Sequence, residues 1–150
     1  MGNPGIMIAA VKSGSGTGSI AIEIAKRSGQ IQVYAVEKKP LALELIKKNI
    51  EKFALPNIQV IEGEAPDCLT EEKRKEKPTH ALIGGSSGRL KEILDALYEK
   101  NKTMRVVIDA ISLETISEIA LLKKDDRITN LEIISVQVSH AKQIGEYQLM

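Results

Sequence analysis

The sequence predicts an α/β protein with a doubly wound, mostly parallel sheet and an antiparallel strand pair at the C-terminal end. Two observations indicate this fold class. Short apolar segments alternate regularly with amphipathic helical segments, and glycine-rich or acidic loops follow several of the apolar segments. The chain has 150 residues, enough for a single domain over residues 1–150 that buries a core.

Continuous apolar residues mark the expected strands, and helical spacing marks the expected helices. Strands buried on both faces of a parallel sheet are expected at residues 6–11, 31–36, 58–61, 79–83 and 106–110. Apolar residues recurring every three or four positions predict helices at residues 18–28, 40–53, 90–100 and 112–124. A long strand at 131–138 and a short one at 147–150 would form the antiparallel pair, and the charged segment 71–77 predicts a solvated helix or turn.

The composition argues against several classes of partner. The formal net charge is +1, from 21 basic and 20 acidic residues mixed along the chain, so no strong field attracts nucleic acid or a membrane. No apolar run approaches the roughly 20 residues of a transmembrane helix. The single cysteine, Cys68, excludes an intramolecular disulfide and a cysteine-based zinc cluster. We therefore expect a cytoplasmic protein with no metal site, no nucleic acid partner and no membrane partner.

A glycine-rich loop after the first strand is the strongest candidate for a binding site. Gly14, Gly16 and Gly18 alternate there with Ser15 and Thr17. Glycines let the backbone approach a ligand closely, and this loop leads into the N-terminus of a helix, where free amides favour negative charge. The pattern predicts an anionic or polar small molecule above the loop.

An acid follows the second strand, about 20 residues beyond the glycine loop. This acid is Glu37, and a carboxylate at its position can accept both hydroxyls of a ribose. Loop and acid together predict a ligand that contains a nucleoside. The loop has the spacing G-x-G-x-G and not the G-x-G-x-x-G of dinucleotide-binding dehydrogenases, which disfavours an NAD-linked oxidoreductase but leaves it as an alternative.

Four loops of the expected sheet would meet at one edge. They are the glycine loop, the loop at Glu37, residues 63–65 and residues 84–89, and each follows a predicted strand. In open α/β sheets, ligands bind at the carboxyl ends of the strands. The convergence of these loops is therefore better evidence for a site than the glycine loop alone.

Several stretches together resemble the cobalamin-pathway methyltransferases. These stretches are residues 13–23, 34–38, 62–66, 83–90 and 113–115. Within that group the chain is similar to the cobalt-precorrin C15-methyltransferases (decarboxylating), also found as the C-terminal half of precorrin-6Y C5,15-methyltransferase. The glycine loop and the acid are shared by many S-adenosylmethionine enzymes, whereas residues 84–90 and Glu64-Ala65-Pro66 indicate the narrower family.

The resemblance implies that S-adenosylmethionine is the cofactor and that its methyl group goes to C15 of a precorrin tetrapyrrole, with decarboxylation of the C12 acetate. Along the methionine part of the cofactor it places Gly14, Ser15, Gly16, Thr17 and Gly18. Glu37, with Lys38 beside it, would hold the ribose, and Glu64 and Ala65 would border the adenine. Gly84 and Gly85 would approach the sulfonium and the substrate.

Candidates for contact with the anionic substrate are Gly85, Arg89, Asp109, His140 and Lys142, and no catalytic residue is assigned. Arg89 would pair with a tetrapyrrole carboxylate, because guanidinium groups match carboxylates, although an exposed arginine in a first helical turn is an equal alternative. Asp109 would line the site or serve as a helix-entry acid. His140 and Lys142 also fit a solvated hairpin tip.

Two departures from the family pattern affect the expected activity. Lys12 stands where the family carries an Asp, two residues before the first glycine, and a cation there cannot accept hydrogen bonds from the loop amides. The family's N-terminal helical segment is not seen before the first strand, so we expect either a domain cut from a longer protein or a homologue that lacks this segment. A non-catalytic partner domain with an impaired cofactor site is a further alternative. The family also implies a homo-oligomer, such as a tetramer.

Overall fold

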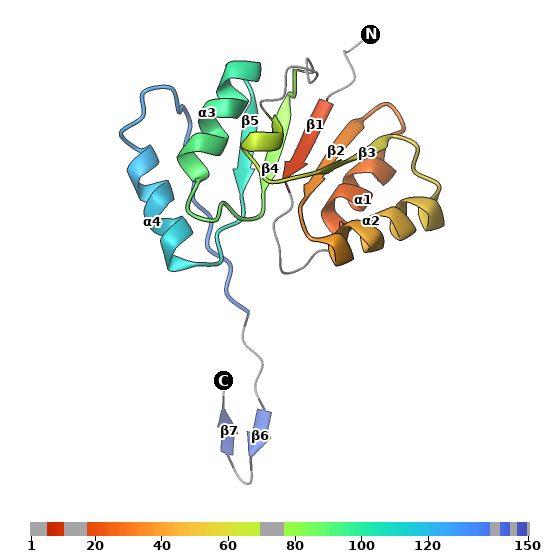
Figure 1. Cartoon of the computed structure of the whole chain (residues 1–150). Coiled ribbons are helices and arrows are strands. Elements are labelled where there is room, and N and C mark those ends of the chain that lie inside the picture. The colour runs from red at the N-terminus through yellow and green to blue at the C-terminus, as the bar shows by residue number, and fades with distance from the viewer. Residues whose placement is uncertain (1–5, 11–17, 70–76, 139–141, 145–146, 150) are drawn as a thin grey trace.

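The body of the protein is a five-stranded parallel sheet in a computed structural model that describes residues 6–10, 18–69, 77–138, 142–144 and 147–149 (Figure 1). Its strands are β1 (Ile6–Ala10), β2 (Gln32–Glu37), β3 (Ile58–Glu62), β4 (His80–Ile83) and β5 (Arg105–Ile108). Their order is β3-β2-β1-β4-β5, and all four pairings are parallel. The strand order reverses at β1, as in doubly wound sheets, which confirms the predicted fold class.

The helices that the structure describes are α1 (Ser19–Arg27), α2 (Pro40–Phe53), α3 (Leu90–Lys100) and α4 (Leu113–Leu122), with a short 3-10 helix η1 (Asp67–Leu69). The four α-helices and the five strands confirm the sequence prediction to within one or two residues, whereas η1 was not predicted. Helix α2 begins at Pro40, where a missing backbone N–H costs nothing. Helix α4 is capped by Ser112, whose hydroxyl accepts from the Thr115 amide at 3.2 Å.

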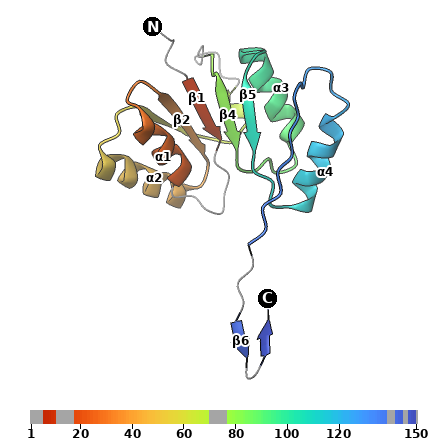
Figure 2. The same ribbon diagram turned by 180° about the vertical axis from the view of Figure 1, so that it is seen from behind.

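The side chains of β2 divide the core into two halves, one on each face of the sheet. Val33 and Ala35 pack with buried residues of α1. Tyr34 and Val36 point the opposite way and pack with buried residues of β4, α3 and α4. In Figures 1 and 2, α1 and α2 lie together near β2 and β3, while α3 and α4 lie together beyond β4 and β5. Burial on both faces explains why the apolar run of this strand is continuous.

The C-terminal part of the chain differs from the prediction. Residues 131–138 form no strand, and all their side chains are exposed, up to 90% for Val138. The antiparallel pair consists instead of β6 (Lys142–Ile144) and β7 (Tyr147–Leu149), a separate two-stranded sheet that lies apart from the body in both views (Figures 1 and 2). The predicted strand was wrong because strand-like residues also need a neighbour for their backbone hydrogen bonds, and within the described residues β5 pairs with β4 alone.

Three other expectations concerned the charged segment 71–77, membrane-spanning helices and metal ligands. The charged segment 71–77 falls outside them except for its last residue. None of the helices in the described part of the chain has the length and apolar character needed to cross a bilayer. The same residues contain no group of three or more His, Cys, Asp or Glu side chains placed to hold a metal ion.

Asn57, which is 8% exposed, ties the end of α1 to the sheet. Its side-chain amide nitrogen lies 3.1 Å from the Ala25 carbonyl oxygen, 3.2 Å from that of Ser28 and 2.9 Å from that of Ile31. The backbone carbonyl of Asn57 accepts from the Val33 amide at 2.8 Å. One buried side chain thus satisfies carbonyls at the C-terminal end of α1 that lack helical partners.

Replacing Asn57 should destabilise the fold. We expect Asn57→Ala to lower the free energy of unfolding by about 2 kcal/mol, because buried carbonyls lose their donor. Urea unfolding followed by circular dichroism measures the change. The control is Gln59→Ala, an exposed position in β3, which should shift the value by less than about 0.5 kcal/mol. Equal effects of the two substitutions would contradict this role.

Gly18 joins the glycine loop to α1 at a point where no side chain fits. Its φ angle is +67°, in the left-handed region. A Cβ atom built on Gly18 would lie 2.7 Å from Cγ1 of Ile46, a fully buried residue of α2. Both the backbone conformation and the contact with α2 therefore require glycine at this position.

Gly18→Ala should destabilise the protein by at least about 1 kcal/mol, because the left-handed conformation alone costs an alanine that much. Thermal and urea unfolding provide the measurement. Gly29→Ala is the matched control: no atom lies within 4 Å of its added Cβ, so its effect should be neutral or slightly stabilising. If the Gly18→Ala protein were as stable as the Gly29→Ala protein, Gly18 would not pack closely on Ile46 in the way described.

Candidate functional site

Parallel register brings the carboxyl ends of four strands to one edge of the sheet. Ala10 at the end of β1 pairs with Val36 of β2 on one side and with Ile83 of β4 on the other. Glu37 pairs with Glu62 at the end of β3. The segments that follow these strands therefore share one edge, at the point where the strand order reverses (Figure 1).

Six of the predicted site residues that the structure describes lie at this edge, after β2, β3 and β4. Those placed directly after the strands β2, β3 and β4, or at their last residue, are Glu37, Lys38, Glu64, Ala65, Gly84 and Gly85. Gly18 opens α1, whereas Gly14, Ser15, Gly16 and Thr17 lie outside the described residues. The predicted convergence is thus confirmed for the loops after β2, β3 and β4.

Glu37 is the most buried charged residue of the site, with 1% of its surface exposed. Its Oε1 accepts from the backbone amides of Lys38 and Lys39, each at 2.8 Å. Lys39 is the N-cap of α2 and provides no side-chain cap, so the carboxylate of Glu37 takes over amides at the start of that helix.

The second carboxylate oxygen of Glu37 has no such partner. Oε2 is buried and accepts no hydrogen bond from any residue that the structure describes. A buried, unsatisfied oxygen costs free energy, and a ligand hydroxyl that donates to it would remove that cost. The vicinal hydroxyls of a ribose are donors of this kind, so Glu37 fits a nucleoside ligand.

The loop that begins at Gly63 is bound to the end of β2. The Gly63 amide donates to the Glu37 carbonyl at 2.9 Å, and Lys38 Nζ lies 2.6 Å from Glu64 Oε1. The hydrogen bond from the Lys38 ammonium holds the pKa of Glu64 below its usual value. A Cβ atom on Gly63 would lie 2.8 Å from Cβ of Cys68, so a side chain at position 63 would displace the loop.

Arg89 holds the other end of the same loop. Its Nη1 and Nη2 donate to the two carboxylate oxygens of Asp67 at 2.9 and 3.0 Å, a bidentate pair. Its Nη2 also donates to Glu92 at 2.8 Å, one turn along α3. Hydrogen bonds from the guanidinium lower the pKa of Asp67. The predicted substrate contact is therefore engaged by two carboxylates of the protein itself.

Glu118 of α4 shapes the segment between β4 and α3, and the sequence did not single it out. Its Oε2 accepts from the buried Ser86 hydroxyl at 2.7 Å, and its Oε1 accepts from the Leu90 amide at 3.1 Å. The signal that could have found it is the start of α3, where Arg89 provides no side-chain cap and an acceptor from elsewhere is needed.

The three remaining candidates differ in position: one lies at this edge, one lies apart from the body and one falls outside the described part of the chain. Asp109 follows β5 at the same edge, is exposed, and donates its amide to the Ile83 carbonyl at 2.8 Å. Lys142 belongs to β6, apart from the body in both views (Figures 1 and 2). His140 falls outside the described residues. The structure therefore does not bring Lys142 to the other site residues.

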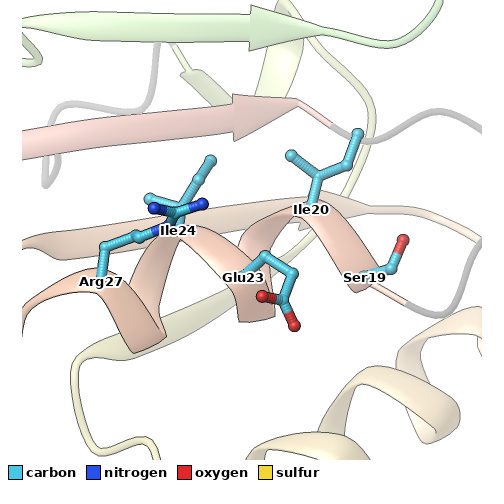
Figure 3. A pocket seen from close by; sticks show the side chains of 5 residues that line it. All are labelled: Ser19, Ile20, Glu23, Ile24 and Arg27. Atoms are coloured by element: carbon cyan, nitrogen blue, oxygen red, sulfur yellow. The ribbon is translucent and has the colours of Figure 1, made fainter.

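A shallow apolar hollow of about 270 Å³ lies on the outer side of α1. Ser19, Ile20, Glu23, Ile24 and Arg27 line it, and Figure 3 shows Ile20 and Ile24 pointing to the same side of the helix. None of these residues is one of the polar groups at the strand ends. The hollow is therefore a feature of the helix surface, separate from the site around Glu37.

Sequence comparison identifies relatives among the cobalt-precorrin methyltransferases. The model of the family described as "Precorrin methyltransferase domain" matches residues 4–150. A probable cobalt-precorrin-6B C(15)-methyltransferase (decarboxylating) of Saccharolobus solfataricus is 41% identical over 129 residues, 84% of this chain and 64% of that protein. The relative of the same name in Sulfolobus acidocaldarius is 45% identical over 104 residues, 68% of this chain and 53% of that protein. The chain thus matches only about half to two thirds of the length of these relatives.

Solved structures give the same result. The precorrin-6y C5,15-methyltransferase of Geobacter metallireducens superposes with a TM-score of 0.76 at 27% identity, over 99% of this chain and 76% of that chain. M. capricolum TrmK, in complex with S-adenosylhomocysteine, shares the fold alone, with a TM-score of 0.54 at 21% identity over 79% of this chain and 51% of that chain. The family match over nearly the whole sequence is decisive: this chain belongs to the precorrin methyltransferase domain family.

Proposed function

We propose that this protein is an S-adenosylmethionine-dependent C-methyltransferase that acts on a precorrin at C15 and removes the carboxyl group of the C12 acetate. The observation that carries the cofactor assignment is Oε2 of Glu37, a buried oxygen without a hydrogen-bond donor among the described residues. The substrate and the reaction follow the printed names of the relatives, which are longer than this chain.

The proposed cofactor would lie along the shared strand edge. Glu37 would accept from the ribose hydroxyls, Glu64 and Ala65 would border the adenine, and Gly84 would face the sulfonium. The glycine loop at residues 14–18 would follow the methionine part. When bound, S-adenosylmethionine supplies an already activated methyl group, so this chain mainly has to bind, orient the reactants and exclude water. No side chain is needed as a covalent nucleophile.

Two alternatives are weaker. An NAD-linked oxidoreductase would also use an acid at position 37, but the glycine spacing and the family membership favour methyl transfer. A non-catalytic partner domain has its support in Lys12, which lies outside the described residues. Substrate contacts at Gly85 and Asp109, a cytoplasmic location and a homo-oligomer such as a tetramer stay predictions.

Glu37→Gln tests the cofactor site. We expect the unaltered protein to bind S-adenosylhomocysteine in isothermal titration, and Glu37→Gln to bind about 10- to 100-fold more weakly, because a carboxylate that accepts ligand hydrogen bonds is worth about 1.5 to 3 kcal/mol. Glu62→Gln is the matched control, since Glu62 is exposed and lies opposite Glu37 in the register. Folded, unaltered protein that gives no heat would count against the site, and binding of NADH by fluorescence would favour the oxidoreductase.

Lys12→Asp tests the departure from the family pattern. A carboxylate at position 12 can accept from loop amides and bind the cofactor's ammonium group, so we expect S-adenosylmethionine to bind at least about tenfold more tightly. The same titration measures it, with Lys47→Asp, an exposed position on α2, as the control for the change of charge. Unchanged affinity in Lys12→Asp would mean that position 12 does not contact the cofactor.

A further inference from the structure

We propose that Arg89 is a positioning residue that joins the two loops flanking the cofactor site through its ion pair with Asp67. This proposal rests on the proposed function in one respect: its effect on binding is measured with S-adenosylhomocysteine, the product of the proposed cofactor. The two loops are residues 63–67, after β3, and residues 84–89, after β4.

The geometry of the Asp67–Arg89 contact suits a rigid link. Two parallel hydrogen bonds of 2.9 and 3.0 Å join the guanidinium to both carboxylate oxygens. Exposed ion pairs usually contribute little, but bidentate pairs within a network are the exception. Arg89 also donates to the carboxylate of Glu92, from Nη2 at 2.8 Å and from Nε at 3.0 Å. The guanidinium is thus fixed in one orientation with Asp67 on one side.

Each loop is also bound to a second element of the fold. The Arg89–Asp67 pair therefore connects two loops that are each held elsewhere. The 63–67 loop is tied to β2 by the Lys38–Glu64 ion pair at 2.6 Å. The 84–89 segment is tied to α4 through the Ser86 hydroxyl, which donates to Glu118 at 2.7 Å. The Arg89–Asp67 pair connects these two anchored loops across the strand ends. Its two hydrogen bonds run directly from one loop to the other.

This role differs from the substrate contact expected from the sequence. A bidentate contact with a substrate carboxylate would need N–H groups of Arg89 that already donate to Asp67 or Glu92, because four of the five N–H groups are engaged there. As a link, Arg89 needs no contact with the substrate. It acts by keeping Glu64 and Ala65 on one loop in a fixed relation to Gly84 and Gly85 on the other.

The experiment is a double-mutant cycle read out by hydrogen exchange and by titration with S-adenosylhomocysteine. Arg89→Met and Asp67→Asn should each weaken binding by about threefold to tenfold, and the double variant should be no weaker than either single variant, because both remove one interaction. Glu92→Gln is the matched control: it removes the other partner of Arg89, within α3, and should change binding less than twofold. Without ligand, amide exchange should rise in residues 63–69 and 84–90 together in Arg89→Met and Asp67→Asn.

Each result decides for or against the link. Faster exchange in both segments supports it even if no variant binds the ligand, in which case the proposed function fails and the link does not. Unchanged exchange in residues 63–69, or additive losses in the double variant, would overturn it. So would an Arg89→Met protein that binds S-adenosylhomocysteine normally but has a raised KM for the tetrapyrrole, because that pattern belongs to a substrate contact. An effect of Glu92→Gln as large as that of Asp67→Asn would also overturn it.

Discussion

The burial of one carboxylate at the end of β2 is the constraint around which the site is built. Removing a charged group from water costs several kcal/mol unless hydrogen bonds replace the lost hydration. Glu37 recovers part of that cost from the amides of Lys38 and Lys39, which lead into α2. The two oxygens therefore differ: one accepts amides at the start of a helix, and the other would accept from the proposed ligand. A structural acid and a binding acid are here the same residue.

Helix ends without caps of their own are served by side chains from outside the helix. Glu37 serves the start of α2, Glu118 serves the start of α3, and Asn57 serves the end of α1. Each of these contacts links two elements in addition to satisfying backbone groups. Glu37 and Glu118 make such contacts at the edge of the sheet that holds the site, and Asn57 makes them at the opposite edge. The two halves of the core depend on apolar packing.

The sequence was informative where a feature is local and uninformative where it depends on a distant partner. Apolar runs and helical spacing located β2 and α3, and the parallel arrangement then placed Glu37 and Gly84 at one edge. Glu118 could not be found in this way, because an acid in the middle of a helix has no pattern that shows which amide it accepts from. Arg89 was recognised as a candidate, but one of its two carboxylate partners, Asp67, comes from a separate segment. Residues 131–138 have a strand-like pattern, yet strand formation also requires a neighbour to pair with.

The close approach of Gly18 to Ile46 links the glycine loop to the interior of the protein. Position 46 is fully buried, so a larger side chain there has no solvent into which it can move. A side chain at position 18 meets the same atoms from the other direction. A larger side chain at either position requires a change at the other. Substitutions at positions 18 and 46 are therefore coupled during evolution. Among homologous sequences, the two positions should vary together or not at all. The packing of the core thus limits which residue can join the glycine loop to α1.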